Sequence, residues 1–167
     1  MRLRNILIIL ISVTFLSCKT DKTERIEKTD ESDIHMLNDS DEEMDNTIPL
    51  ARQTMNKFEK AYKENNDDYK DFLIKMPFNS THGYEHIWLS DITYVNNKFR
   101  GVVNKSPAFT REVNFGDTII IDTKKISDWM YIENGKLRGG YSIRAIRNKM
   151  SASQKKEFDK GFGITIE

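Results

Sequence analysis

The sequence predicts an α+β domain in which a bent antiparallel sheet of about five or six strands is preceded by one helix and followed by a short one. Three observations support this fold class. An apolar stripe with helical spacing follows Thr47. From about residue 72 onward, short apolar runs alternate with turn residues, as in successive strands. Between two of these runs lies Asn134-Gly135, a strong signal for a hairpin.

The first helix is predicted from the residues that begin and end it. Thr47 is suited to cap the helix, and Pro49 is tolerated in the first turn, where a missing N–H costs nothing. Apolar residues then recur at spacings of four, three and four, at Ala51, Met55, Phe58 and Tyr62. The polar run at 65–68 ends the helix.

The remaining elements are mostly strands. They are predicted at 72–78, 87–95, 98–103, 118–121, 129–132 and 137–146. Asn96-Asn97 and Asn134-Gly135 form two-residue turns, because Asn and Gly tolerate positive φ.

A short helix is predicted at the C-terminal end of the sequence. Ser151 and Gln154 form a capping box at its start, and Gly161 is expected to cap its C-terminus. Residues 164–166 are predicted to add an edge strand.

Residues 1–17 have the features of a secretory signal peptide. Arg2 and Arg4 precede an apolar run that is too short to span a bilayer, and Ser17-Cys18 follows that run directly. A small residue before a cysteine at this point resembles the lipobox of bacterial lipoproteins, in which the cysteine is lipidated. Cys18 is also the only cysteine of the chain, so it has no disulfide partner. We therefore expect a lipid anchor on Cys18, and alternatively an ordinary signal peptide or an uncleaved anchor.

The composition divides the rest of the chain into a tether and a head. Residues 19–47 carry eleven acidic and four basic side chains and no aromatic one, which indicates a disordered acidic tether over 18–47. The head, 48–167, carries 20 basic and 15 acidic side chains and is about the size of one domain. This excess is too small to favour nucleic-acid binding, and the head contains no thiol.

Several ordered segments of the head resemble one bacterial family. They are EHIWL at 85–89, FRGVVN at 99–104, GD at 116–117, ISDWMY at 126–131 and GGYSIR at 139–144. Together they resemble the family catalogued as domain of unknown function 2314, which includes the YegJ-like proteins. The resemblance covers roughly residues 50–147 and implies one domain. It implies no reaction.

Two motifs suggest catalysis but lack the context that they need. H-x-x-E-H from His82 to His86 matches an inverted zinc-peptidase signature, which requires a helix. Gly83 and the onset of a strand at Glu85 argue against one, and the two imidazoles of a strand would lie about 13 Å apart. S-x-x-K at 153–156 lacks the companion motifs of penicillin-recognising enzymes. We therefore predict no metal site, no cofactor and no catalytic residue.

The candidate binding residues cluster around the predicted hairpins. The principal set is Asp128, Trp129, Tyr131, Tyr141 and Arg144, in which an Asp–Arg pair and an aromatic surface could form a half-polar concave patch. The alternative is that Trp129 belongs to the core, Asp128 caps a turn and Arg144 pairs with Asp128 in a structural role. Glu85, His86, Trp88 and Asn104 are further candidates with the same ambiguity.

The leading functional hypothesis is a lipid-anchored, non-enzymatic binding module of a bacterial cell envelope, at the inner or the outer membrane. Its partners would be the membrane, through lipid on Cys18, and an envelope protein or a small ligand, with no nucleic acid. Two alternatives stay open. One is a small hydrolase-like enzyme that uses Glu85, His86 or Asp128 as acid–base groups. The other is a passive envelope component.

Overall fold

The computed structural model describes residues 46–167 and has the predicted α+β architecture. Its elements are α2 (Thr47–Glu64), β1 (Tyr69–Ser80), β2 (Gly83–Val95), β3 (Lys98–Val103), β4 (Thr118–Ile121), β5 (Asp128–Glu133), β6 (Lys136–Gly139), α3 (Tyr141–Lys149) and α4 (Ala152–Phe162). The predicted signal peptide, the predicted lipidation site Cys18 and nearly all of the predicted tether lie outside the described residues. Within 46–167, no helix is both long enough and apolar enough to cross a bilayer.

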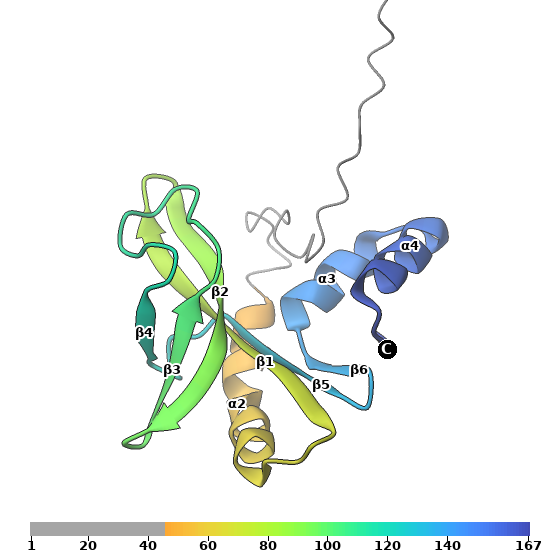
Figure 1. Ribbon diagram of the computed structural model, residues 1–167. Helices are drawn as coiled ribbons and strands as arrows, with labels where there is room; N and C mark the ends of the chain where they lie inside the picture. The colour runs from red at the N-terminus through yellow and green to blue at the C-terminus, as the bar shows by residue number, and fades with distance from the viewer. Residues whose placement is uncertain (1–45) are drawn as a thin grey trace, which may run out of the picture. The chain divides into compact units, whose positions relative to one another are not determined.

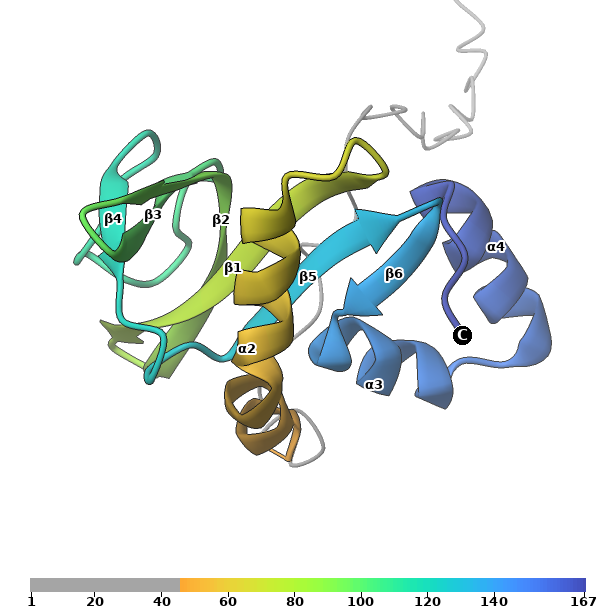
Figure 2. The same cartoon turned by 90° about the horizontal axis from the view of Figure 1, so that it is seen from below.

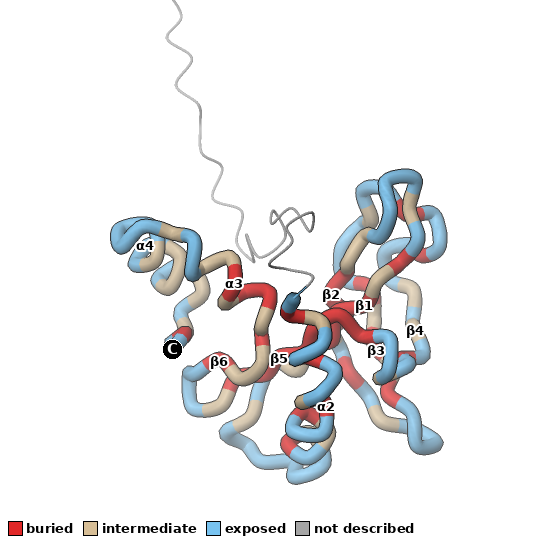
Figure 3. The backbone as a smooth tube through the Cα atoms, turned by 180° about the vertical axis from the view of Figure 1, so that it is seen from behind, coloured by how far each residue is buried: buried red, intermediate tan, exposed pale blue. Residues whose placement is uncertain are grey.

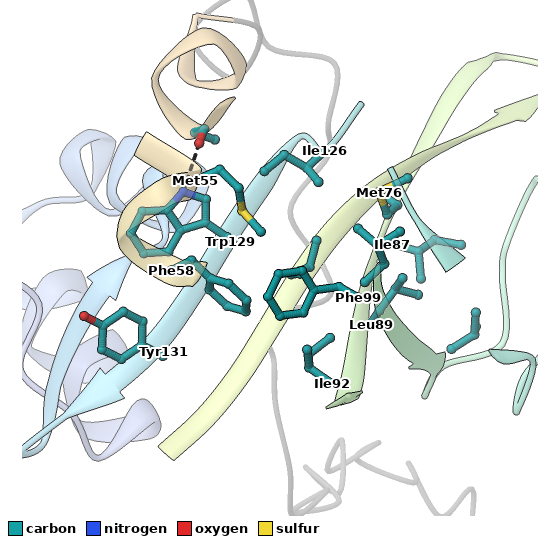
Figure 4. Packing of buried hydrophobic residues seen from close by; sticks show 14 of the residues in the cluster. Met55, Phe58, Met76, Ile87, Leu89, Ile92, Phe99, Ile126, Trp129 and Tyr131 are labelled. Atoms are coloured by element: carbon teal, nitrogen blue, oxygen red, sulfur yellow. Dashed lines mark hydrogen bonds between the residues drawn. The ribbon is translucent and has the colours of Figure 1, made fainter. Parts of the chain in front are cut away.

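The six strands form one antiparallel sheet in the order β4-β3-β2-β1-β5-β6 (Figure 1). Helix α2 lies across one face of the sheet, and α3 and α4 lie together at its β6 side (Figure 2). The largest apolar cluster is centred on Phe58 of α2, whose ring packs edge-on against Phe99 and Trp129 (Figure 4). A second cluster packs Ile143 of α3 against Met130 and Leu137 of β5 and β6.

Both hairpin predictions are confirmed. Asn96 and Asn97 have φ values of 52° and 60°, and Asn134 and Gly135 have values of 49° and 74°, as a two-residue primed turn requires. The strand at 118–121 is also found where it is predicted. β1 is longer than the predicted 72–78, because it continues in both directions through polar residues that pair with β5 and β2.

The first helix differs from the prediction at its start. Asn46, and not Thr47, is the N-cap residue, and it makes no side-chain capping hydrogen bond. Thr47 is the first helical residue and is buried. The end of the helix is as predicted, because Asn65 adopts the left-handed conformation that terminates it.

The prediction of a strand at 137–146 is wrong. β6 ends at Gly139, and α3 begins at Tyr141. The reason is the conformation of Gly139 and Gly140, whose φ values of 67° and 62° turn the chain out of the sheet. The apolar alternation after Gly140 therefore belongs to the short amphipathic helix α3.

The last helix has the predicted capping box, in which the Ser151 side chain accepts from the Gln154 N–H. Its C-cap is Gly163 and not Gly161, because the helix continues for two more residues than predicted before a residue with positive φ occurs. The segment 164–166 makes a single bridge, from Thr165 to Lys136 of β6, rather than a full edge strand.

Candidate recognition surface at the end of the β1–β2 hairpin

The carboxylate of Asp128 is fully buried and holds the start of α3. Its Oδ1 accepts from the N–H groups of Trp129 (2.8 Å) and Tyr141 (3.2 Å). Its Oδ2 accepts from the N–H (2.8 Å) and the hydroxyl (2.7 Å) of Ser142. Burial raises the pKa of Asp128 above its ordinary value, although the hydrogen bonds from Ser142 act in the opposite direction. Asp128 thus caps, from β5, a helix whose own N-cap is Gly140.

The aromatic members of the principal set belong to the core. Trp129 is 2% exposed, and its indole N–H donates to the carbonyl of Ala51 in α2 at 2.9 Å (Figure 4). Tyr131 is buried beside it, and the half-buried ring of Tyr141 meets Trp129 edge-on at 5.8 Å. The hydroxyl of Tyr141 bonds that of Thr54. The predicted concave patch of Trp and Tyr rings is therefore wrong, because these rings join α2 to the sheet.

Arg144 does not pair with Asp128. Its guanidinium donates to the carbonyls of Gly139 (2.9 Å) and Leu137 (2.7 Å), and also to that of Glu167. Among the residues that the structure describes, no ion pair joins Asp128 to Arg144. Arg144 thus ties α3 to β6 and to the last residue of the chain.

The acid–base candidates Glu85 and Asp128 are on opposite faces of the sheet. Glu85 is opposite Phe78 of β1, and Asp128 is opposite Lys75. Because Phe78 and Lys75 are three residues apart on one strand, their side chains point to opposite faces. Trp88 shares the face of Lys75, is 4% exposed, and has the Lys75 ammonium 5.7 Å from its ring centroid. Glu85 and Asp128 therefore do not form one site; His86, which is opposite Pro77, shares the face of Asp128.

Glu85 instead holds the long loop at 104–117. Its carboxylate accepts from three consecutive backbone N–H groups, those of Ala108 (2.7 Å), Phe109 (2.8 Å) and Thr110 (2.7 Å). Burial acts to raise the pKa of Glu85, but the three N–H groups outweigh it, and the pKa lies below its ordinary value. A carboxylate in this environment stays ionised at neutral pH and serves as an anchor for the loop.

The same loop is also fastened to β1. Thr110 bridges Ser80, and its hydroxyl donates to the Asn79 carbonyl at 2.6 Å. Glu112 accepts from the N–H (2.8 Å) and the side-chain amide (2.7 Å) of Asn79. Val113 is buried in the main core. The loop therefore covers the core at the end of the hairpin and is held at both of the hairpin's strands (Figure 1).

Two exposed aromatic rings, those of Tyr84 and Phe109, lie at this end of the domain. Six large apolar side chains of the described residues are exposed: Leu50, Tyr84, Val95, Phe109, Phe115 and Ile120. The three aromatic ones all belong to the β1–β2 hairpin or to the loop at 104–117. Tyr84 is 64% exposed and Phe109 is 55% exposed. We call residues 80–86 together with 105–111 the aromatic tip; Figure 3 shows this end of the hairpin as mostly exposed.

The aromatic tip carries rings on both of its sides. Tyr84 and Glu85 are neighbours on one strand, so their side chains point to opposite faces. Because Glu85 binds the loop that carries Phe109, Tyr84 lies on the other face. The rings continue around the end, since His82 meets Phe109 edge-on at 5.3 Å and His86 meets Tyr84 at 6.5 Å. The result is a protruding wedge with aromatic rings on two faces.

Of the candidates near this wedge, Glu85 and His86 are half-buried within the tip, and Asn104 is exposed at the beginning of the loop. Sequence reasoning missed Tyr84 and Phe109. One signal was present for Phe109, because an aromatic residue between Pro107 and Gly116, in a segment without strand or helix periodicity, is poorly placed to enter a core.

The H-x-x-E-H motif lies in the tip and is not helical. His82 is in the turn between β1 and β2, and His86 is within β2. Over residues 46–167, no group of three His, Cys, Asp or Glu side chains is arranged to hold a metal ion. An open depression of about 450 Å³ lies elsewhere, where α2 faces β3 and β4, and is lined mainly by polar residues such as Glu59, Lys98 and Asp122.

Comparison with known proteins shows which family the chain belongs to. The model of a family described as uncharacterised proteins conserved in bacteria, DUF2314, matches residues 41–166. The chain belongs to this family. It is 37% identical over 100 residues to the uncharacterised protein YegJ of Escherichia coli K12, which covers 60% of this chain and 64% of that protein.

It is also 33% identical over 96 residues to a putative ankyrin repeat protein of Neisseria meningitidis serogroup B, covering 55% of this chain and 38% of that protein. The chain thus spans less than two thirds of the length of either relative. No solved structure matches it.

Proposed function

We propose that the chain is a non-enzymatic binding module of the bacterial cell envelope, anchored to a membrane by lipid on Cys18, and that the aromatic tip is its recognition surface. The observation that carries the proposal is the combination of exposure and rigidity at the tip. Tyr84 and Phe109 expose more than half of their surface, while the backbone beside them is fixed by the three hydrogen bonds to Glu85.

Aromatic side chains on a fixed backbone are well suited to recognition. They offer a large contact area, and few rotatable bonds have to be ordered when a partner binds. The same rings add little to folding, because their surfaces remain in water. An exposed cluster of this kind therefore favours a binding role over a purely structural one.

The acid–base alternative receives less support. Asp128 is enclosed and accepts four hydrogen bonds. Glu85 is occupied by backbone N–H groups, and its lowered pKa makes it a weak proton donor near neutrality. Neither carboxylate is placed to exchange a proton with a substrate.

The test is sedimentation of the mature chain, residues 18–167 with Cys18→Ser, with envelope fractions. Without the anchor, retention depends on the head alone. We expect the double variant Tyr84→Ala and Phe109→Ala to lose most of the retention. Ile120→Ala is the matched control, because Ile120 is 56% exposed on β4 and lies outside the tip. Equal retention of all variants would refute the recognition role of the tip.

The anchor is tested separately in cells. The full chain should fractionate with membranes, and Cys18→Ser should abolish lipid attachment when the N-terminal peptide is weighed by mass spectrometry. An unmodified Cys18 in the native protein would contradict the anchor.

A further inference from the structure

We propose that the aromatic tip is a membrane-contact surface that inserts its rings into the headgroup region of a bilayer containing anionic lipids. This inference rests on the proposed function and names the partner of the same surface. Three observations support it: the position of the tip relative to the start of the domain, the charges that surround its rings, and its convex form.

The first observation is that the tip and the start of the domain are at the same end. Helix α2 has 18 residues and covers about 27 Å, and β1 has 12 residues and covers about 40 Å in the opposite direction. Only residues 65–68 connect them. The end of β1 therefore returns past the beginning of α2, and both views place the hairpin end on the side where α2 begins (Figures 1 and 2).

This arrangement suits a head that is tethered to a bilayer. In the sequence, 27 residues separate Cys18 from Asn46. A tether that joins the domain at this end lets the tip face the surface that holds the anchor, with no need to reverse the head.

The second observation concerns charge. Two carboxylates lie at this part of the loop: Glu85 accepts from three backbone N–H groups, and Glu112, which is exposed, accepts from Asn79. The exposed charged side chains at this part of the loop include two cations, Lys105 and Arg111, and one anion, Glu112, and Lys105 also acts on the Glu85 carboxylate, whose pKa it helps to lower. Cations beside exposed aromatic rings match an interface of anionic headgroups over an apolar interior.

The third observation is the form of the surface. Rings on both faces of a protruding wedge cannot lie together against one flat, rigid partner. A bilayer interface is deformable and surrounds an inserted wedge on all sides. Phe109 and His82 on one face and Tyr84 on the other therefore fit a lipid surface better than a flat protein epitope.

The structure provides a clean spectroscopic test. Both native tryptophans are buried, Trp88 at 4% and Trp129 at 2% exposure, so a tryptophan introduced at the tip reports on its own surroundings. The probe is Phe109→Trp in the mature chain with Cys18→Ser, and the matched control is Ile120→Trp. Vesicles are made of phosphatidylcholine alone, or of phosphatidylcholine and phosphatidylglycerol at a ratio of about 3:1, a proportion chosen to give a net negative surface.

We expect the emission of the tip probe to shift to the blue and to be quenched by brominated acyl chains, with anionic vesicles only, while the control does not change. Removing Phe109 and Tyr84 by substitution with Ala should weaken vesicle binding about tenfold or more. No shift, or an equal shift at the control position, would overturn the inference.

The outcomes separate this inference from the proposed function. Tip-dependent retention by envelope fractions without binding to vesicles would indicate a protein partner, which overturns the inference and leaves the binding module intact. If the tip contributed neither to retention by envelope fractions nor to vesicle binding, the proposed function would be refuted as well. Each variant is accepted only if its unfolding midpoint equals that of the unsubstituted chain.

Discussion

The replacement Asp128→Asn tests whether the buried carboxylate of Asp128 stabilises the start of α3. The side chain keeps its size and loses its charge. The carboxylate accepts four hydrogen bonds, two on each oxygen, and an amide retains only one oxygen. Whichever way the amide is oriented, its NH₂ group faces two donors.

The expected cost follows from those donors. If the amide oxygen faces Ser142, the N–H groups of Trp129 and Tyr141 lose their acceptor. A buried donor without an acceptor costs about 1–3 kcal/mol, so the two would cost about 2–6 kcal/mol. Part of this is offset, because the amide has no charge to desolvate, and burial disfavours the charged form of Asp128. We expect a net loss of about 1–4 kcal/mol in the free energy of unfolding.

The assay is urea unfolding of residues 18–167 with Cys18→Ser, followed by far-UV circular dichroism and by the fluorescence of the two buried tryptophans, Trp88 and Trp129. A parallel Asp67→Asn variant controls for the loss of one negative charge, because Asp67 is exposed at the end of α2. We also expect faster amide exchange in α3 of the Asp128 variant. An unchanged unfolding midpoint together with unchanged exchange in α3 would refute the capping role.

Three further predictions follow from the structure. The pKa of Glu85 is lowered in the folded protein, so this carboxylate contributes stability that is present above the unfolded pKa of about 4.3 and is lost as pH falls through the folded pKa. Glu85→Gln should therefore make the free energy of unfolding depend less on pH in the acid range. It should also speed amide exchange in the loop at 104–117. Gly139→Ala should destabilise by more than about 2 kcal/mol in urea, because φ is +67° and the new Cβ would lie 2.2 Å from the carbonyl oxygen of Trp129. Gly161→Ala should instead stabilise α4 by about 0.5 kcal/mol in the same assay, because no atom lies within 4 Å of its added Cβ; destabilisation there would contradict the helix assignment.

The elements that sequence reasoning found are those defined by local chemistry. Asn96-Asn97 and Asn134-Gly135 specify their turns through residues that tolerate positive φ, and the stripe of α2 needs only a period of 3.6. The failure at 137–146 was also local in appearance. One cause is local, the positive φ values of Gly139 and Gly140, and a second is distant, because Asp128 of β5 supplies the cap with which a helix begins after Gly140.

The candidate site was less accessible from sequence for a related reason. Trp129 and Tyr131 are residue types that are common at binding hot spots, but α2 covers them. The hydrogen bond from the Trp129 indole to the carbonyl of Ala51 joins residues that are 78 positions apart in the sequence. Phe109 is exposed because Glu85, 24 residues earlier, fixes the loop that carries it. Neither relation is visible in periodicity or spacing.

Hydrogen–deuterium exchange of residues 18–167, with and without envelope membranes, locates the contact surface without any substitution. We expect membranes to slow exchange at the aromatic tip, residues 80–86 and 105–111, and to leave exchange unchanged around the open depression near Lys98 and Asp122. Slowed exchange at the depression with none at the tip, or no slowing anywhere in residues 46–167, would contradict this expectation.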